Sequence, residues 1–130
     1  MADSKQVSEF LEGECWAVVG ASDDRSKFGN ITFRKLKQHG KKVFPINKKA
    51  AEVEGDTAYP TLADVPERVD RVLIVVPPKQ GETVVQEADE AGIHSVWFQP
   101  GAESAAALAY CESHGMTAIA GRCILVTLGD

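Results

Sequence analysis

Residues 15–37 constrain the fold more than any other part of the chain, because a strand pattern changes there into a helix pattern across one polar turn. The apolar run Cys-Trp-Ala-Val-Val ends at Gly20, and apolar residues at helical spacing resume after Lys27. This order is typical of the opening unit of a nucleotide-binding α/β domain. Gly20, Ser22 and the unpaired N–H groups at the start of the helix suit an anion such as phosphate. A turn that holds no ligand is the alternative interpretation of this stretch.

The remainder of the chain predicts further strands that alternate with helices. We expect strands at 15–19, 42–46, 70–76, 94–98 and 116–120, and helices at 27–39, 80–91 and 104–113. The run at 70–76 is apolar without alternation, as in a parallel sheet with helices on both faces. The predicted fold is therefore α/β, a doubly wound parallel five-stranded Rossmann-like sheet with strand order 3-2-1-4-5.

All 130 residues fit one domain, 1–130, with a first segment, 1–12, at its edge. Within that segment, Val7, Phe10 and Leu11 have the spacing of a short amphipathic helix at 4–11. Residues 50–66 read as an irregular crossover with a one-turn helix capped by Thr61. The tail after Gly121 is expected to pack across the edge of the sheet.

Composition narrows the functional classes. The net charge of −5, from 14 basic and 19 acidic residues with the basic ones dispersed, is unlike that of a nucleic-acid-binding domain. No run approaches the roughly 18 apolar residues of a membrane span, and no secretory leader is visible, so we expect a cytoplasmic protein without a membrane partner. The 3 cysteines form no Cys-x-x-Cys pair, so neither a disulfide framework nor a metal site is predicted.

The ends of the predicted strands point to a particular class of nucleotide. The positions of a Gly-x-Gly-x-x-Gly motif would be Gly20, Ser22 and Arg25, and the second strand closes on Asn47 and Lys48 instead of an acidic residue. Both departures disfavour NAD, and no P-loop motif is present. Lysines at the ribose end suit an adenosine that carries an extra phosphate. Coenzyme A and NADP both meet that description.

Several short motifs, taken in order, resemble one family. They are Gly20-Ala21-Ser22 with Lys27-x-Gly29, Val43-x-Pro45-x-Asn47, the Val-Val-Pro-Pro of 75–78, Trp97-x-Gln99-x-Gly101 and Arg122-Cys123-Ile124. Together they resemble the small bacterial and archaeal CoA-binding proteins, stand-alone relatives of the N-terminal domain of the succinyl-CoA synthetase alpha subunit. The resemblance covers nearly the whole chain after about residue 12 and implies a Rossmann-like domain that binds coenzyme A or an acyl-CoA.

The same resemblance implies a set of ligand-binding residues. It places the pyrophosphate at Ser22 and the turn through Lys27 and Gly29, the adenosine near the end of the second strand, and the pantetheine arm near the turn at 99–101. The full set is Gly20, Ala21, Ser22, Lys27, Phe28, Gly29, Pro45, Asn47, Lys48, Val76, Pro77, Gln99 and Gly101. Val76 and Pro77 would wall the adenine.

No catalytic residue is assigned from the sequence. In the ligase, catalysis needs a phosphorylated histidine from a further domain, so catalysis does not carry over to this chain. The alternatives are an NADP-linked oxidoreductase, a small acyl-CoA enzyme that uses Cys123, and a metabolite-sensing interaction protein. Cys123 also suits a small buried hydrophobe, and Asp23 and Asp24 suit a turn. The sequence is compatible with a homodimer or another protein partner.

Overall fold

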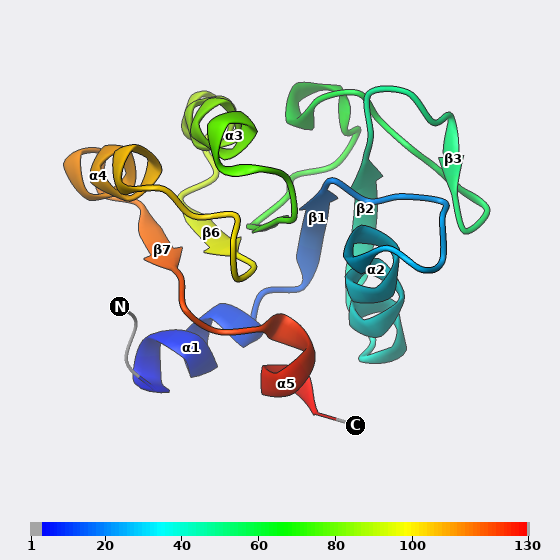
Figure 1. Cartoon of the computed structure of the whole chain (residues 1–130), viewed down its shortest axis with the longest axis horizontal. Helices are drawn as coiled ribbons and strands as arrows, with labels where there is room; N and C mark the ends of the chain where they lie inside the picture. The colour runs from blue at the N-terminus through cyan, green and yellow to red at the C-terminus, as the bar shows by residue number, and fades with distance from the viewer. Residues whose placement is uncertain (1–3, 130) are drawn as a thin grey trace.

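A parallel sheet of 5 strands forms the middle layer of the molecule (Figure 1). The structure is a computed structural model and describes residues 4–129. The strands are β1 (Cys15–Val19), β2 (Lys42–Ile46), β5 (Arg71–Ile74), β6 (Ser95–Phe98) and β7 (Thr117–Ile119), in the order β2-β1-β5-β6-β7. The predicted α/β class and the five strands are confirmed, and residues 1–3 of the predicted edge segment lie outside the described part.

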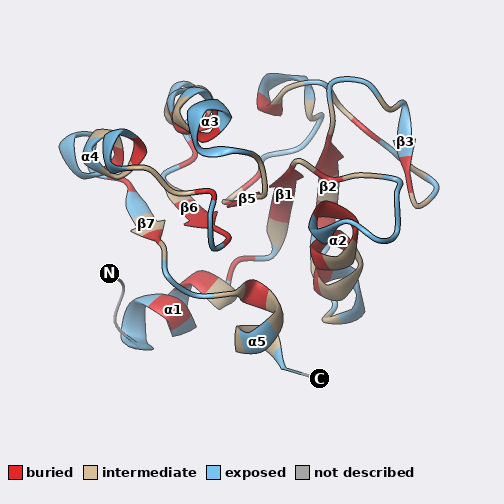
Figure 2. Cartoon of the chain, viewed as in Figure 1, coloured by how far each residue is buried: buried red, intermediate tan, exposed pale blue. Residues whose placement is uncertain are grey.

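Helices cover both faces of the sheet. One face carries α1 (Ser4–Leu11), α2 (Phe28–Gln38) and α5 (Ile124–Leu128), and the other carries α3 (Pro78–Glu90) and α4 (Ala105–Ser113). Figure 2 shows burial concentrated in the strands and on the helix sides that face them. Within residues 4–129, no helix combines the length and the apolar character that crossing a membrane requires.

Two apolar cores, one on each side of the sheet, follow from the sequence pattern. Val72, Leu73 and Ile74 of β5 are all fully buried, so the run without alternation faces helices on both sides as predicted. Behind β1, the rings of Trp16 and Phe10 meet edge to face with centroids 5.3 Å apart, which fixes α1 against the sheet.

One strand takes a different place from the predicted one. The expected order 3-2-1-4-5 put the strand at 70–76 outside β2, whereas β5 pairs with β1 and β6 in the interior of the sheet. The observed order is close to the prediction, and β2 is the edge strand. The outer edge of β2 is closed by Tyr59, which donates to the Pro45 carbonyl and accepts from the Asn47 N–H. Pro45 has no N–H to offer a further strand on that side, which favours an edge position.

The crossover between β2 and β5 contains its own small elements. β3 (Glu52–Val53) and β4 (Asp56–Thr57) form an antiparallel hairpin, and the 3-10 helix η1 (Leu62–Asp64) follows. Thr61 is the N-cap of η1 as predicted, and the Asp64 Oδ2 accepts from both its N–H and its hydroxyl. The tail differs from the expectation: it forms α5, which packs against α2 on one face of the sheet and not across the edge.

Candidate ligand-binding site

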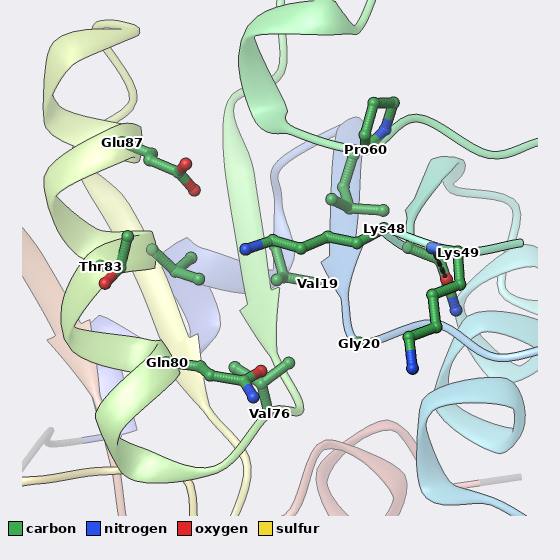
Figure 3. A pocket seen from close by; sticks show the side chains of 12 residues that line it. Val19, Gly20, Lys48, Lys49, Pro60, Val76, Gln80, Thr83 and Glu87 are labelled. Carbon is green, nitrogen blue, oxygen red and sulfur yellow. Dashed lines mark hydrogen bonds between the residues drawn. The ribbon is translucent and has the colours of Figure 1, made fainter.

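The sheet reverses its strand order between β1 and β5, and a cavity opens there (Figure 3). After β1 the chain enters α2 on one face, and after β5 it enters α3 on the other, so the two connections diverge above the strand ends. With the expected order 3-2-1-4-5 this point would lie between the first and fourth strands, so its position is corrected together with that of β5. The cavity has a volume of about 330 Å³.

Apolar side chains form the floor of this cavity and polar side chains its two walls. The lining residues are Val19, Gly20, Ile46, Asn47, Lys48, Lys49, Pro60, Val76, Gln80, Thr83, Val84 and Glu87. In Figure 3 the Lys48 side chain extends across the opening toward α3, where Thr83 and Glu87 face it. Lys49 extends away from α3, on the side of Gly20. The site therefore presents ammonium groups over an apolar slot, which suits a flat ring with a phosphate attached.

Glycine is sterically required at two positions of the turn after β1. Gly20 has a φ of +98°, and a β-carbon there would lie 2.3 Å from the Val75 carbonyl oxygen. A β-carbon on Gly29 would lie 1.9 Å from the Gly20 carbonyl oxygen. The two glycines let the start of α2 lie directly against the end of β1, next to Gly20 in the lining of the cavity.

The N-terminus of α2 carries no side-chain cap, which is also true of α3 and α5. Its N-cap residue is Lys27, which makes no capping hydrogen bond. The nearby hydroxyl of Ser22 is used inside the turn, where its Oγ accepts from the Asp24 N–H at 3.0 Å. An exposed helix N-terminus with a lysine instead of an acidic residue favours an anionic ligand. Phe28 begins the helix and is 63% exposed.

The side chain of Asn47 fixes the loop that carries Lys48 and Lys49. Its amide Nδ2 donates to the Ala21 carbonyl at 2.8 Å, and its Oδ1 accepts from the backbone N–H groups of Lys49 and Ala50 at 2.7 and 2.8 Å. The side chain thereby joins the turn after β1 to the loop after β2 and holds the backbone of Lys48 at the rim. All of these hydrogen bonds of the Asn47 side chain go to the backbone and stabilise the two loops.

The residues implied by the family resemblance fall into three groups in space. Gly20, Asn47, Lys48 and Val76 line the cavity, whereas Ala21, Ser22, Lys27, Phe28 and Gly29 form the adjoining turn and helix start. Pro45 is buried in β2, Pro77 is the N-cap of α3, and Gln99 and Gly101 follow β6 outside the residues that line the cavity.

The Gln99 side chain is buried and holds the end of the chain. Its Oε1 accepts from the Ile124 N–H at 2.7 Å, and its Nε2 lies 3.5 Å from the Cys123 Sγ. These contacts fix the start of α5 beside the end of β6. The side-chain amide of Gln99 is thus occupied by its contacts at the start of α5. A ligand arm near this turn would therefore contact the backbone of residues 99–101.

Several residues that line the cavity, including three polar ones on α3, were not predicted from the sequence. Lys49, Pro60, Gln80, Thr83 and Glu87 all line the cavity. No sequence motif marks the polar residues of α3, because their place at the site depends on β5 lying next to β1. Within residues 4–129, no group of three His, Cys, Asp or Glu side chains is arranged to hold a metal ion.

Comparison with known proteins finds relatives among the CoA ligases. The alpha subunit of ADP-forming acetate–CoA ligase II from Pyrococcus furiosus is 41% identical over 81 residues, which is 62% of this chain and 18% of that subunit. The ADP-forming acetate–CoA ligase I from Archaeoglobus fulgidus is 38% identical over 71 residues, which is 55% of this chain and 10% of that ligase. The chain therefore matches only a small part of these curated relatives.

Solved structures match over most of the chain. A conserved hypothetical protein from Pyrococcus furiosus has a TM-score of 0.84 and 42% identity, and the match covers 88% of this chain and 98% of that one. A hypothetical protein from Pyrococcus horikoshii has a TM-score of 0.89 and 31% identity, with 95% and 87% covered. A family model described as a CoA binding domain matches residues 14–129. The chain, with its uncapped helix and lysine-lined slot at the β1–β5 crossover, belongs to the CoA-binding domain family.

Proposed function

We propose that the protein binds coenzyme A or an acyl-CoA at the rim between β1 and β5, without a catalytic step of its own. The observation that carries the proposal is the pairing of two anion-attracting features at one rim. The uncapped N-terminus of α2 lies at one end, and Lys48 crosses the cavity at the other. CoA carries its anionic groups in the same arrangement, with a pyrophosphate and a separate ribose phosphate on one adenosine.

In this placement the pyrophosphate lies on the turn between Gly20 and Gly29, where the first N–H groups of α2 and Lys27 meet it. The adenine enters the apolar slot, with Val76 as one wall. Lys48 meets the ribose phosphate as a point charge with three donors. The pantetheine arm leaves the slot toward the backbone that follows β6, near Gly101.

The sharpest test compares two ligands that differ only in the ribose phosphate. Lys48→Ala should weaken CoA by about 2- to 30-fold, since a partly exposed charge pair contributes about 0.5 to 2 kcal/mol. Dephospho-CoA lacks the phosphate that Lys48 meets and should lose far less affinity. Isothermal titration calorimetry of both ligands on both proteins measures the difference.

Lys5→Ala is the matched control, because it removes the same charge from an exposed position on α1. Equal losses for CoA and dephospho-CoA would remove Lys48 from the ribose phosphate. NADP serves as a third ligand in the same titrations. If NADP bound as tightly as CoA, the path given to the pantetheine arm would be wrong. Native mass spectrometry of the purified protein identifies any acyl-CoA that it carries.

A further inference from the structure

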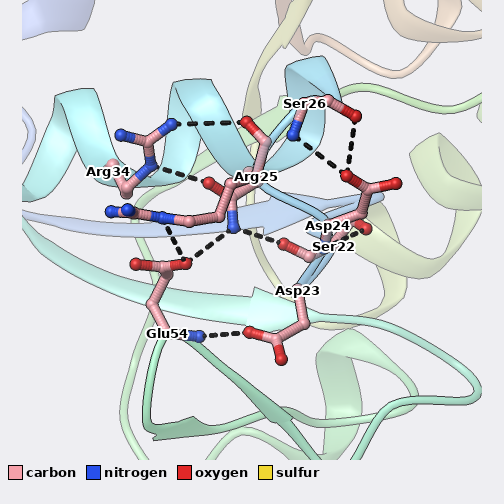
Figure 4. Close-up of polar contacts among 8 residues, drawn as sticks. Ser22, Asp23, Asp24, Arg25, Ser26, Arg34 and Glu54 are labelled. Carbon is pink, nitrogen blue, oxygen red and sulfur yellow. Dashed lines mark hydrogen bonds and ion pairs between the residues drawn. The ribbon is translucent and has the colours of Figure 1, made fainter.

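The β3–β4 hairpin reaches the anion-binding turn through one residue, Glu54. The Glu54 N–H donates to the Asp23 Oδ1 at 2.9 Å. Its carboxylate Oε2 lies 3.2 Å from the Arg25 Nε and accepts from the Asn30 Nδ2 at 3.0 Å. Figure 4 shows these contacts converging on Glu54 from the turn after β1 and from α2. Backbone and side chain of a single hairpin residue therefore hold two residues of the turn directly.

Asn30 extends this junction to a third residue of the turn. It is fully buried, and the same Nδ2 that meets Glu54 also donates to the Ser22 carbonyl at 2.8 Å. Its Oδ1 accepts from the Arg34 Nε at 2.7 Å, so both ends of the amide are fixed. The Asn30 hydrogen bond, with help from Arg25 and Arg34, holds the pKa of Glu54 below its ordinary value, so the group is a carboxylate at neutral pH.

The hairpin is a firm support for this junction. Val53, the residue before Glu54, is fully buried in the same apolar core as Phe33 and Leu36 of α2. An ion pair between Asp56 and Lys37 ties the other strand to α2. By contrast, residues 23–28 of the turn are exposed. The rigid partner in this contact is the hairpin, and the turn is the part that it restrains.

Glu54 occupies a backbone conformation that its residue type disfavours. Its φ is +51°, and within residues 4–129 every other residue with a positive φ is a glycine. Glu54 and Gly55 both have positive φ in a two-residue hairpin turn, where Asn, Asp or Gly is the preferred first residue. Asn and Asp are one methylene shorter than Glu. Glu54 is therefore less favourable for this turn than Asn or Asp would be, but its longer side chain reaches Arg25 and Asn30.

We propose that Glu54 is a positioning residue that holds the turn at 22–27 in its anion-binding conformation before the ligand arrives. The inference rests on the proposed CoA site and adds to it a residue that does not touch the ligand. Restraint of the free turn lowers the ordering cost of binding. Because the turn meets the pyrophosphate, the benefit is the same for CoA and dephospho-CoA.

The test uses two substitutions of Glu54 and one matched control. Glu54→Asn suits the turn but falls short of Arg25 and Asn30, so it should weaken CoA and dephospho-CoA equally, by about 3- to 30-fold. Glu54→Gln retains a hydrogen bond to Asn30 and should lose only about 2- to 3-fold. Glu52→Gln removes the same charge from an exposed position in the hairpin and should cause no loss.

Hydrogen exchange on the unliganded proteins separates positioning from general stability. Glu54→Asn should speed backbone exchange at 22–27 while the thermal midpoint stays close to that of the wild type. Wild-type protein that binds no CoA would refute the binding site itself. If the wild type binds and Glu54→Asn binds equally well, or loses affinity only in step with its thermal stability, the positioning role is wrong.

Discussion

The thiols of Cys111 and Cys123 lie in opposite surroundings, although in the sequence both are isolated cysteines. Burial and the nearby Asp89 carboxylate raise the pKa of Cys111 to about 11. Burial also raises the pKa of Cys123, but hydrogen bonds from the Gln99 amide and from the backbone at the start of α5 outweigh it, and this pKa lies below the ordinary value. The thiolate is the reactive form, so it appears at Cys123 at lower pH.

We expect iodoacetamide to modify Cys123 well before Cys111 in the folded protein at about pH 7.5, because the pKa of Cys123 is lowered and that of the buried Cys111 is raised, so Cys123 has the larger thiolate fraction. Peptide mass mapping over a time course measures the two rates. Gln99→Leu removes a hydrogen bond to the thiolate and should move the pH midpoint of the Cys123 rate upward. Equal rates at the two cysteines, or a midpoint unchanged by Gln99→Leu, would contradict this assignment.

At the scale of the element, α2 begins in a way that lowers its own stability. A lysine at the N-cap makes no hydrogen bond to the first turn and places a positive charge at the positive end of the helix dipole. Both features are unfavourable for the free helix and favourable once an anion is bound. If the pyrophosphate binds there as proposed, the start of α2 is less stable in the free protein than in the complex.

Lys27→Asp should reverse this balance. An aspartate at the N-cap accepts from the first-turn N–H groups, so the free protein should gain about 1 kcal/mol and melt about 3 to 6 °C higher. The same carboxylate repels the pyrophosphate, so CoA affinity should fall. Differential scanning calorimetry and titration calorimetry measure the two effects, with Arg68→Asp as an exposed charge-matched control. A variant that is more stable and still binds CoA as tightly as the wild type would move the pyrophosphate away from α2.

At the scale of the whole molecule, the proposed ligand site lies at the carboxyl edge of the sheet. The cavity is lined by strand ends and α3, and its described lining contains neither histidine nor cysteine. Cys123 lies beside Gln99, outside that lining. The curated relatives are much longer than the part that this chain matches.

We expect the chain by itself to leave acetyl-CoA and succinyl-CoA intact, because a nucleophile, a base and an orienting group do not converge in the described cavity. Release of free CoA thiol, followed with a chromogenic disulfide reagent against a heat-denatured control, measures turnover. Thioester loss above the control that disappears in Cys123→Ser would establish an acyl-CoA enzyme instead.

The sequence by itself determined the local elements and the turn after β1. The strands at 15–19 and 42–46 have the predicted bounds, and the helix predicted at 27–39 differs from α2 by one residue at each end. Apolar periodicity and glycine caps act over a few residues, so they can be read without knowing the neighbours. The same is true of the glycine turn and of Lys48, which lies two residues after the end of β2.

Only the tertiary structure decided which strands are neighbours, and the rest of the site depends on that. With β5 beside β1, the helix that follows it brings Thr83 and Glu87 to the cavity opposite Lys48. Pro45 was the one local sign that β2 lies at the edge. The hydrogen bonds of Glu54 with Asn30 and Asp23 join residues that are separated by 24 and 31 positions in the sequence. Contacts of this kind depend on how a crossover folds back over the sheet, and the local pattern of apolar residues carries no information about that path.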